Sequence, residues 1–102
     1  MTGWTFLTNH ALVLSYIAKH PRVTAREIAA AVGITERATR KIIADLSASG
    51  YARKTREGRR SRYDVEPEVP LRHQMQWDTP IGELLKALGW HRRRVPTSSR
   101  GN

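Results

Sequence analysis

VTAREIAAAVGITERATRKIIADLSASGY, residues 23–51, carries the local signals for two short helices and the turn that joins them. Thr24 and Glu27 have the spacing of a capping box, in which the threonine hydroxyl and the glutamate carboxylate accept hydrogen bonds from free amides at a helix start. A first helix is therefore predicted over residues 25–32, most of which favour helix. Gly33 can adopt the positive φ that commonly ends a helix, so the first helix is expected to stop there.

A second helix is predicted almost directly after the first. Thr35 is suited to be its N-cap, and Glu36 places a negative charge in the first turn, where the helix dipole favours it. The helical pattern continues over residues 36–49, and Gly50 then provides the same kind of stop as Gly33. Two helices joined by about three residues that include glycine are typical of a helix-turn-helix motif.

The second predicted helix has one apolar face and one cationic face. Its apolar residues recur at intervals of three and four, which predicts a buried stripe of Thr39, Ile42, Ile43 and Leu46. The long cations lie largely off that stripe and are Arg37, Arg40 and Lys41. Such a helix suits entry into a DNA major groove, where arginine can bond guanine bidentately and lysine can reach phosphate. The same residues could equally be ordinary solvated charges, and the helix alone does not decide between the two interpretations.

The composition favours a polyanionic partner. With 102 residues the chain is expected to form one small domain. It has 18 lysines and arginines against 9 acidic residues, which gives a net charge of +9 and points to nucleic acid. The absence of cysteine excludes a disulfide framework, a zinc ribbon and a thiol redox switch. No apolar run is long enough to span a bilayer and the N-terminus does not resemble a signal peptide, so a cytoplasmic protein without membrane association is expected.

The N-terminal part of the chain predicts a further helix. Thr8 or Asn9 can cap a helix that runs to Lys19, before a proline stops it. This helix is apolar over much of its circumference, as expected for the scaffold helix of a three-helix core. Residues 22–23 could add a very short strand after it. The segment before the helix is too apolar for a purely solvated arm, since it contains Trp4, Phe6 and Leu7.

After Gly50 the pattern changes to a period close to two, which predicts a β-hairpin. The expected strands are residues 51–56 and 61–65, with a glycine-containing turn at residues 57–60. The hairpin carries six cations, namely Arg53, Lys54, Arg56, Arg59, Arg60 and Arg62. Between residues 37 and 62 there are nine lysines and arginines against two acids, so most of the net charge is localised there. Charges of one sign on neighbouring elements repel unless an anion lies between them, and the localisation therefore favours nucleic-acid binding.

The residues after the hairpin predict an extended connector and one more helix. Residues 66–70 contain two prolines, which oppose helix. Asp78 or Thr79 can cap a helix with Pro80 at its first position. The apolar stripe of that helix consists of Ile81, Leu84, Leu85 and Leu88. This stripe either covers the first helix of the same chain or pairs with its copy in a second subunit, together with Trp4, Phe6 and Leu7. We favour a homodimer, because operators are commonly two half-sites related by a dyad.

The motif TAREIAAAVGITERATRKIIADLSASGY and the hairpin YARKTREGRRSRYDV resemble the winged helix-turn-helix module of bacterial and archaeal transcription regulators of the MarR and IclR families. The resemblance covers residues 9–65. It implies that residues 25–32 form the positioning helix, residues 36–49 the recognition helix and residues 53–63 the wing. It also implies that the recognition helix meets base edges or nearby phosphates, and that the minor groove or backbone is followed by Arg59, Arg60 and Arg62.

The predicted fold is mainly α with a small β-hairpin, a winged helix-turn-helix with a three-helix core, a wing and a C-terminal helix. Residues 1–65 would form the DNA-binding domain with its N-terminal arm, residues 66–90 the connector and a C-terminal helix that could serve dimerisation, and residues 91–102 a disordered basic tail. The expected function is sequence-specific binding of double-stranded DNA by a small transcriptional regulator. The expected DNA contacts are Thr35, Glu36, Arg37, Arg40, Lys41, Arg53, Lys54, Arg56, Arg59, Arg60 and Arg62.

Two other functions are compatible with the same residues. An architectural or RNA-binding protein could use the basic surface without reading sequence, and a winged-helix interaction module could meet an acidic protein with it. The four histidines lack the short spacing of a metal site, so neither a metal ion nor a cofactor is expected. An enzyme is not expected either, because no nucleophile motif, carboxylate pair or phosphate-binding glycine loop is present.

Overall fold

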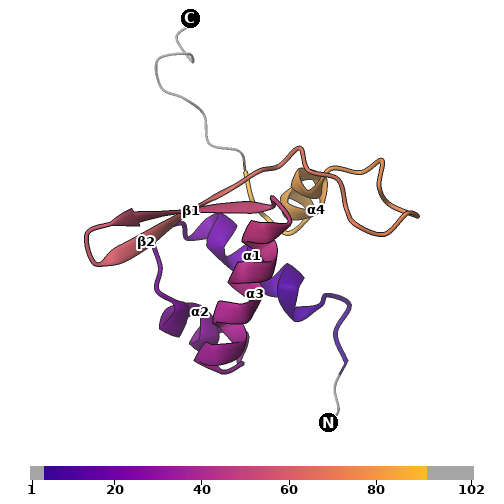
Figure 1. Cartoon of the computed structure of the whole chain (residues 1–102). Coiled ribbons are helices and arrows are strands. Elements are labelled where there is room, and N and C mark those ends of the chain that lie inside the picture. The colour runs from indigo at the N-terminus through magenta and orange to yellow at the C-terminus, as the bar shows by residue number, and fades with distance from the viewer. Residues whose placement is uncertain (1–3, 92–102) are drawn as a thin grey trace, which may run out of the picture.

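The computed structural model describes residues 4–91, which form four helices and a two-stranded antiparallel sheet (Figure 1). In chain order the elements are α1 (Asn9–Lys19), α2 (Ala25–Val32), α3 (Glu36–Ala48), β1 (Ala52–Glu57), β2 (Arg60–Val65) and α4 (Ile81–Ala87). The predicted three-helix core, hairpin and C-terminal helix are therefore confirmed. Of the tail predicted to be disordered, residues 92–102 lie outside the described part of the chain. No described helix is long and apolar enough to cross a membrane.

Capping chemistry sets the start of α2 and of α3, as predicted. The Thr24 hydroxyl accepts a hydrogen bond from the Glu27 amide at 3.1 Å, and the Glu27 carboxylate accepts one from the Thr24 amide at 2.9 Å. Gly33 ends α2 with a φ of 88°, which glycine adopts without a steric penalty. Thr35 then caps α3 by accepting a hydrogen bond from the Ala38 amide at 3.0 Å. The helix-turn-helix therefore follows from local chemistry.

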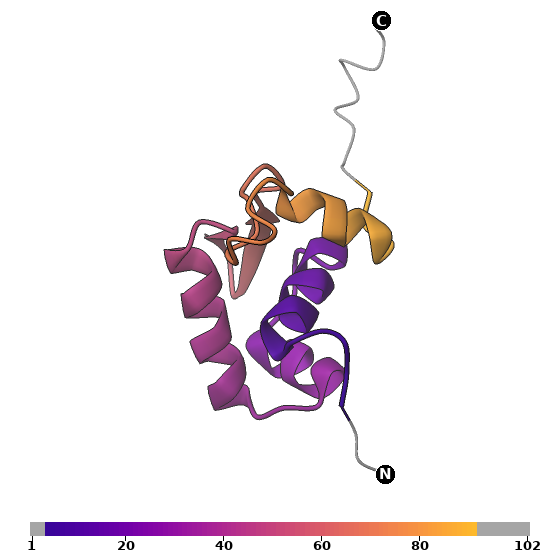
Figure 2. The same cartoon turned by 90° about the vertical axis from the view of Figure 1, so that its right-hand side faces the viewer.

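The core lies between α1, α2 and α3 and continues beneath the base of the hairpin (Figure 2). On α3 the buried residues are the predicted stripe, Thr39, Ile42, Ile43 and Leu46. From α1 the core receives Val13, Leu14 and Ile17. The hydroxyl of the fully buried Thr39 is satisfied, because it donates to the Thr35 carbonyl at 2.9 Å. Burial of this stripe leaves the opposite, cationic face of α3 on the surface.

β1 and β2 form a hairpin closed by two residues. The first pair is Ala52 opposite Val65, and pairing continues to the last residue of β1 opposite the first residue of β2. Only Gly58 and Arg59 lie between the strands, and Gly58 has a φ of 61°. The predicted turn over residues 57–60 was therefore two residues too long, because a glycine at positive φ allows a hairpin to close over two residues.

The very short strand predicted at residues 22–23 does not form. One backbone hydrogen bond, from the Tyr63 amide to the Pro21 carbonyl at 2.8 Å, ties this segment to β2. One hydrogen bond does not make a β-strand pairing. Because α2 already begins at Ala25, no room remains for further strand residues to pair with β2. The segment is nevertheless attached to the hairpin, and its Val23 is buried.

α4 begins one residue later than predicted. Pro80 is extended and is the N-cap, not the first helical residue, and no side chain caps the helix. The amides of Ile81 and Gly82 donate instead to the carbonyls of Val69 at 2.7 Å and Pro67 at 2.8 Å. Because the connector supplies these acceptors, neither of the two predicted capping residues is needed.

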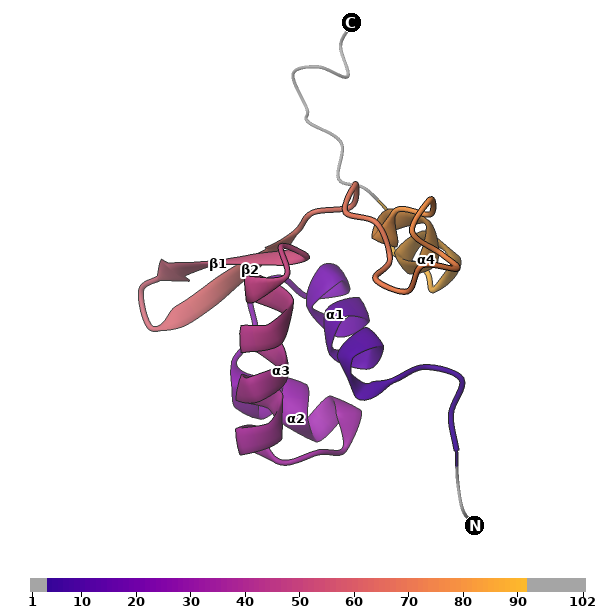
Figure 3. The same ribbon diagram turned by 45° about the vertical axis from the view of Figure 1, so that its right-hand side comes forward.

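α4 lies beside α1, away from the tip of the hairpin (Figure 3). Ile81 and Leu85 are buried in the same core as the apolar residues of α1. Leu84 and Leu88 are only half-buried. After the helix, the Trp90 amide donates to the Leu85 carbonyl at 2.9 Å. The hairpin and α4 therefore occupy different sides of the three-helix core.

Candidate nucleic-acid interface

The exposed face of α3 carries its three predicted DNA-contacting cations. Arg40 Nη2 lies 3.1 Å from Glu36 Oε2, and Lys41 Nζ lies 3.9 Å from Asp45 Oδ1, both between neighbouring turns of the helix. Arg37 forms no ion pair within the described residues. Exposed ion pairs of this kind are weak. All three cations are therefore available to an anion that approaches α3.

The two faces of the hairpin differ in charge. Side chains alternate between the faces along a strand, and residues paired across the strands share a face. By the register of the hairpin, one face, here called the inner wing face, consists of Ala52, Lys54, Arg56, Ser61, Tyr63 and Val65. The opposite, outer wing face consists of Arg53, Thr55, Glu57, Arg60, Arg62 and Asp64. The inner wing face has cations and no acid, whereas the outer wing face has both.

The inner wing face adjoins the cationic side of α3. Tyr63 is buried in the core that also holds the apolar stripe of α3. Burial raises the pKa of Tyr63, and a hydrogen bond with Ser61 and the charge of Arg40 oppose that rise, which places Arg40 near this residue. Lys54 and Arg56 share the face of Tyr63. Among the described residues, neither of these two cations has an acidic partner, so the positive charge of the inner wing face is uncompensated.

The outer wing face is largely neutralised by ion pairs. Arg53 Nη2 lies 3.1 Å from Glu66 Oε2 at the base of the hairpin. Arg62 lies between two acids, 3.6 Å from Glu57 Oε2 and 3.4 Å from Asp64 Oδ1. Its buried Nε is within ion-pair distance of Asp64 but makes no hydrogen bond. This face therefore has less positive charge to offer a polyanion than the sequence suggests.

Two further ion pairs join the wing to the start of α2. Arg60 Nη1 and Nη2 donate to the two carboxylate oxygens of Glu27 at 2.9 and 3.2 Å, and Nη1 also donates to the Arg22 carbonyl at 3.1 Å. Arg22 Nε donates to Glu57 Oε1 at 2.8 Å. The hydrogen bonds from Arg60, followed by the capping bond from Thr24, lower the pKa of Glu27 to about 2. We call these side chains the wing clamp, consisting of Arg22, Glu27, Glu57 and Arg60.

The structure divides the nine predicted cationic contacts into two groups. The cations without an ion pair to any described residue are Arg37, Lys54, Arg56 and Arg59. The cations held in ion pairs are Arg40, Lys41, Arg53, Arg60 and Arg62. Of the two uncharged or acidic residues predicted to contact DNA, Thr35 is the N-cap of α3 and Glu36 is its first residue. The sequence analysis did not identify Arg22 and Glu27 as partners of the wing. Their partners are 35 and 33 residues away along the chain, and no local sequence pattern predicts ion pairs over such separations.

The residues predicted for a dimer interface lie in different environments. Those buried in the core of this chain are Ile81 and Leu85. Those half-buried are Leu7, Leu84 and Leu88. Trp4 and Phe6 are 76% and 91% exposed, and their rings contact each other edge to face with centroids 4.9 Å apart. The dimer interface stays a prediction, and the aromatic pair is the part of it most open to a second copy.

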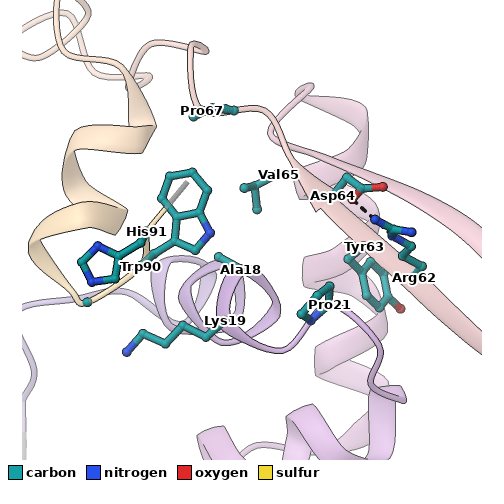
Figure 4. Close-up of a pocket in the computed structure, with 11 residues that line it drawn as sticks. Ala18, Lys19, Pro21, Arg62, Tyr63, Asp64, Val65, Pro67, Trp90 and His91 are labelled. Carbon is teal, nitrogen blue, oxygen red and sulfur yellow. Dashed lines mark ion pairs between the residues drawn. The ribbon is translucent and has the colours of Figure 1, made fainter. Parts of the chain in front are cut away.

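Two cavities lie away from the cationic face of α3. One, of about 520 Å³, opens between the end of α1, β2 and the residues after α4, where Lys19, Arg62 and Trp90 line it (Figure 4). The other, of about 820 Å³, lies between α1, α3 and α4, with Leu14 and Leu46 in its wall. Within the described part of the chain, no group of three or more histidine or acidic side chains is placed to hold a metal ion.

A sequence model of the MarR family matches residues 4–62, which include the helix-turn-helix and most of the wing. The chain belongs to the MarR family. Proteins of the MarR family are winged-helix regulators, which implies a role in transcription regulation through DNA binding. The resemblance to winged helix-turn-helix regulators that the sequence indicated is therefore confirmed.

Among solved structures, this MarR-family chain is similar to the PcaV transcriptional regulator from Streptomyces coelicolor, whose crystal structure is in complex with its natural ligand. The TM-score is 0.55 and the sequence identity is 21%, over 86% of this chain and 64% of PcaV. At this identity the similarity shows the shared winged-helix fold alone, and the chain spans less than two thirds of PcaV. The comparison with curated proteins finds no match.

Proposed function

We propose that this MarR-family protein is a small transcriptional regulator that binds double-stranded DNA sequence-specifically. In the proposed complex α3 enters the major groove, with Arg37, Arg40 and Lys41 at base edges or nearby phosphates. The inner wing face follows the adjacent minor groove or backbone through Lys54 and Arg56. Contacts to base edges supply the sequence preference, whereas contacts to phosphate fix the orientation of the protein on the duplex.

The observation that carries this proposal is the placement of the unpaired cations. Lys54 and Arg56 lie on the acid-free hairpin face that adjoins α3, and Arg37 lies on the exposed side of that helix. Arg59 extends the series to the hairpin loop. Positive charges gathered in this way repel one another in the free protein, and a polyanion between them removes that repulsion.

The start of α3 adds a second attraction for phosphate. The free amides and the dipole of a helix favour an anion at its N-terminus. Thr35 satisfies the Ala38 amide, and the exposed Arg37 lies in the same turn. Arg40 can leave its weak pair with Glu36 to meet a guanine edge, where a bidentate contact is stronger and more specific.

Selection from a random duplex pool, followed by binding measurements, tests the proposal. The enriched duplex and a shuffled duplex of the same length and composition are titrated by fluorescence anisotropy at several salt concentrations. We expect the enriched duplex to bind about a thousandfold more tightly at matched salt. Four unpaired cations predict that log K falls with log salt by a slope of about −3 to −4 per protomer.

The other outcomes of this experiment identify the competing functions. Equal affinity for both duplexes would reject sequence-specific regulation and support an architectural protein. Tighter binding to single-stranded or hairpin RNA would support an RNA-binding function. Failure to bind any nucleic acid at low salt would leave the winged-helix interaction module as the remaining function, with an acidic protein as its partner.

A further inference from the structure

The far half of the wing has little apolar contact with the rest of the molecule. The side chains of residues 53–60 are all exposed, whereas the buried residues Ala52 and Tyr63 lie nearer the base of the hairpin. A two-stranded hairpin by itself is marginally stable in water. The direction in which the wing tip points must therefore depend on polar contacts.

The wing clamp supplies those polar contacts. Arg60, the first residue of β2, holds both carboxylate oxygens of Glu27 and the carbonyl of Arg22. Arg22 in turn holds Glu57, the last residue of β1. Both strands are thus attached, directly beside the hairpin loop, to the segment that leads from α1 down to α2 and to the first turn of α2 (Figure 1). Glu27 is itself fixed by its capping bond with Thr24, so the attachment point is a defined helix start.

We propose that Arg60 and Glu27 are positioning residues that hold the inner wing face at the angle at which it meets DNA, and that Arg60 does not itself contact phosphate. This inference rests on the proposed DNA binding and replaces the sequence-based expectation that Arg60 follows the minor groove. α2 packs against α3, so a wing tied to α2 keeps a fixed position relative to the recognition helix. Preorganisation of this kind reduces the ordering cost of binding.

The negative charge of Glu27 makes the inference testable by the sign of an effect. If DNA affinity depended only on the overall electrostatic potential of the protein, removal of a carboxylate would strengthen binding to a polyanion. If Glu27 positions the wing, the same removal weakens binding, although the protein becomes more positive. The two models therefore predict opposite changes from one substitution.

The test uses the full chain with Glu27→Gln, measured on the enriched duplex. Glutamine also serves at the third position of a capping box, so the start of α2 is retained while the ion pair with Arg60 is lost. The matched control is Glu66→Gln, which releases Arg53 at the base of the wing but cuts no link to α2. We expect Glu27→Gln to weaken binding by a factor between about 1.5 and 5, the range that an exposed ion pair supplies. Glu66→Gln should leave binding unchanged or tighten it.

A double variant separates positioning from direct contact. If Arg60 acts through Glu27, Arg60→Gln weakens binding about as much as Glu27→Gln does, and the double variant is no weaker than either single variant. If Arg60 touches phosphate, Glu27→Gln releases it and tightens binding, while Arg60→Gln reduces the salt slope by about one. That second pattern would overturn the inference.

A readout without DNA keeps the two proposals distinguishable. Backbone ¹⁵N relaxation of residues 53–60 in the free protein should show lower order parameters in Glu27→Gln than in the wild type, and no change in Glu66→Gln. A wing that is equally rigid in all three proteins would overturn the inference. If the wild type bound no duplex, the proposed function would fail, and the relaxation data alone would decide whether Glu27 orients the wing.

Discussion

Arg37 and Arg60 are both exposed arginines of the candidate interface, but their surroundings in the free protein differ. Arg37 has no ion pair with any described residue, whereas Arg60 gives hydrogen bonds to Glu27 and to the Arg22 carbonyl. A free side chain can adapt its rotamer to a base edge, and a side chain held at two oxygens cannot do so without losing them. Under the two proposals, Arg37 is therefore a contact residue and Arg60 a positioning residue.

Replacement of Arg40 tests the proposed base contact. Arg40 lies in the second turn of α3, and its only ion pair in the described chain is the weak one with Glu36. We expect Arg40→Ala to cost about 1 to 3 kcal/mol on the enriched duplex and to relax preference at one base-pair position. The measurement is anisotropy with duplexes that vary that position singly. An unchanged affinity and an unchanged preference would show that Arg40 faces away from the bases.

Arg26→Ala is the matched control for Arg40→Ala. Arg26 is an exposed cation on α2 without an ion pair to a described residue, and it is not among the proposed DNA contacts. Its removal subtracts the same unit of charge from the protein. We expect a small loss of affinity that is equal for all duplexes, so any change of base preference in Arg40→Ala reports a local contact.

The acid sensitivity of folding tests the link between Glu27 and Arg60. The pKa of Glu27 is lowered from 4.5 to about 2, mainly by the Arg60 hydrogen bonds. A carboxyl with a lowered folded-state pKa stabilises the fold above its unfolded-state pKa, and this contribution is lost as the pH falls through the folded-state value. The thermal midpoint of the wild type should exceed that of Glu27→Gln at pH 7, and the gap should close between about pH 4.5 and pH 2. A constant gap over this range would show that the carboxylate is not paired in solution.

Local sequence patterns predicted which side chains are exposed cations, but not which of them are paired. The spacing of Thr39 and Ile42 fixed the buried side of α3, so the exposed positions followed. The pair of Arg60 with Glu27 joins residues 33 positions apart. It depends on where the hairpin loop comes to lie over α2, which only the tertiary structure determines. The position of a cation was predictable here, and its partner was not.

The same division holds for whole elements. α2 and α3 begin at the predicted residues, because their caps are side chains within three positions of the helix start. α4 begins one residue late, because its first amides are satisfied by the carbonyls of Pro67 and Val69, more than ten residues upstream. The two helices whose starts are set by neighbouring residues were predicted to start at the right residue, and the helix whose start is set by a distant backbone was not.

Close contact between Gly82 and the connector leaves no room for a side chain at this position of α4. A Cβ at Gly82 would lie 2.7 Å from Pro67 Cβ and 3.0 Å from the Pro67 carbonyl oxygen. Both atoms belong to a rigid residue, and that carbonyl also accepts the Gly82 amide at 2.8 Å. We expect Gly82→Ala to lower the free energy of unfolding by about 1 to 2 kcal/mol, because overpacking outweighs the better helix propensity of alanine. Denaturant unfolding followed by circular dichroism measures the change.

Glu83→Ala is the control for the docking of α4. Glu83 is the next residue of the helix and is exposed, so its truncation alters helix propensity without a clash. We expect a change within about 0.5 kcal/mol, as for most surface substitutions. If Gly82→Ala proved more stable than the wild type, helix propensity would dominate and the contact with Pro67 would be looser than the structure indicates.

At the scale of the molecule, the wing and the N-terminal aromatic pair point in different directions. Figure 3 shows the hairpin extending to one side of α3, with α4 and the N-terminal segment toward the other. Trp4 and Phe6 are largely exposed, and large apolar side chains grouped on a surface commonly mark an interface. A second copy bound through this side would leave both cationic faces free, as two half-sites related by a dyad require.

Association through the aromatic pair can be tested by sedimentation velocity. We expect the wild type to sediment as a dimer at micromolar concentration, and the double variant Trp4→Ser with Phe6→Ser to sediment as a monomer. The far-ultraviolet circular dichroism spectrum of the variant should be unchanged, because both side chains lie outside the core. Two linked half-sites gain avidity from the tethering of two DNA-binding units, so the monomer should also lose much of its affinity for a palindromic duplex.

Trp77→Ser is the control that distinguishes a specific dimer interface from non-specific association through exposed apolar side chains. Trp77 is 68% exposed, but it lies in the long loop before α4 and is not part of the proposed interface. We expect this variant to remain dimeric. A monomeric wild type at every concentration would reject the dimer, whereas dissociation by Trp77→Ser and not by the double variant would move the interface to that loop. Because Ile81 and Leu85 are already buried within one chain, an interface at either place must be built mainly from side chains outside the core.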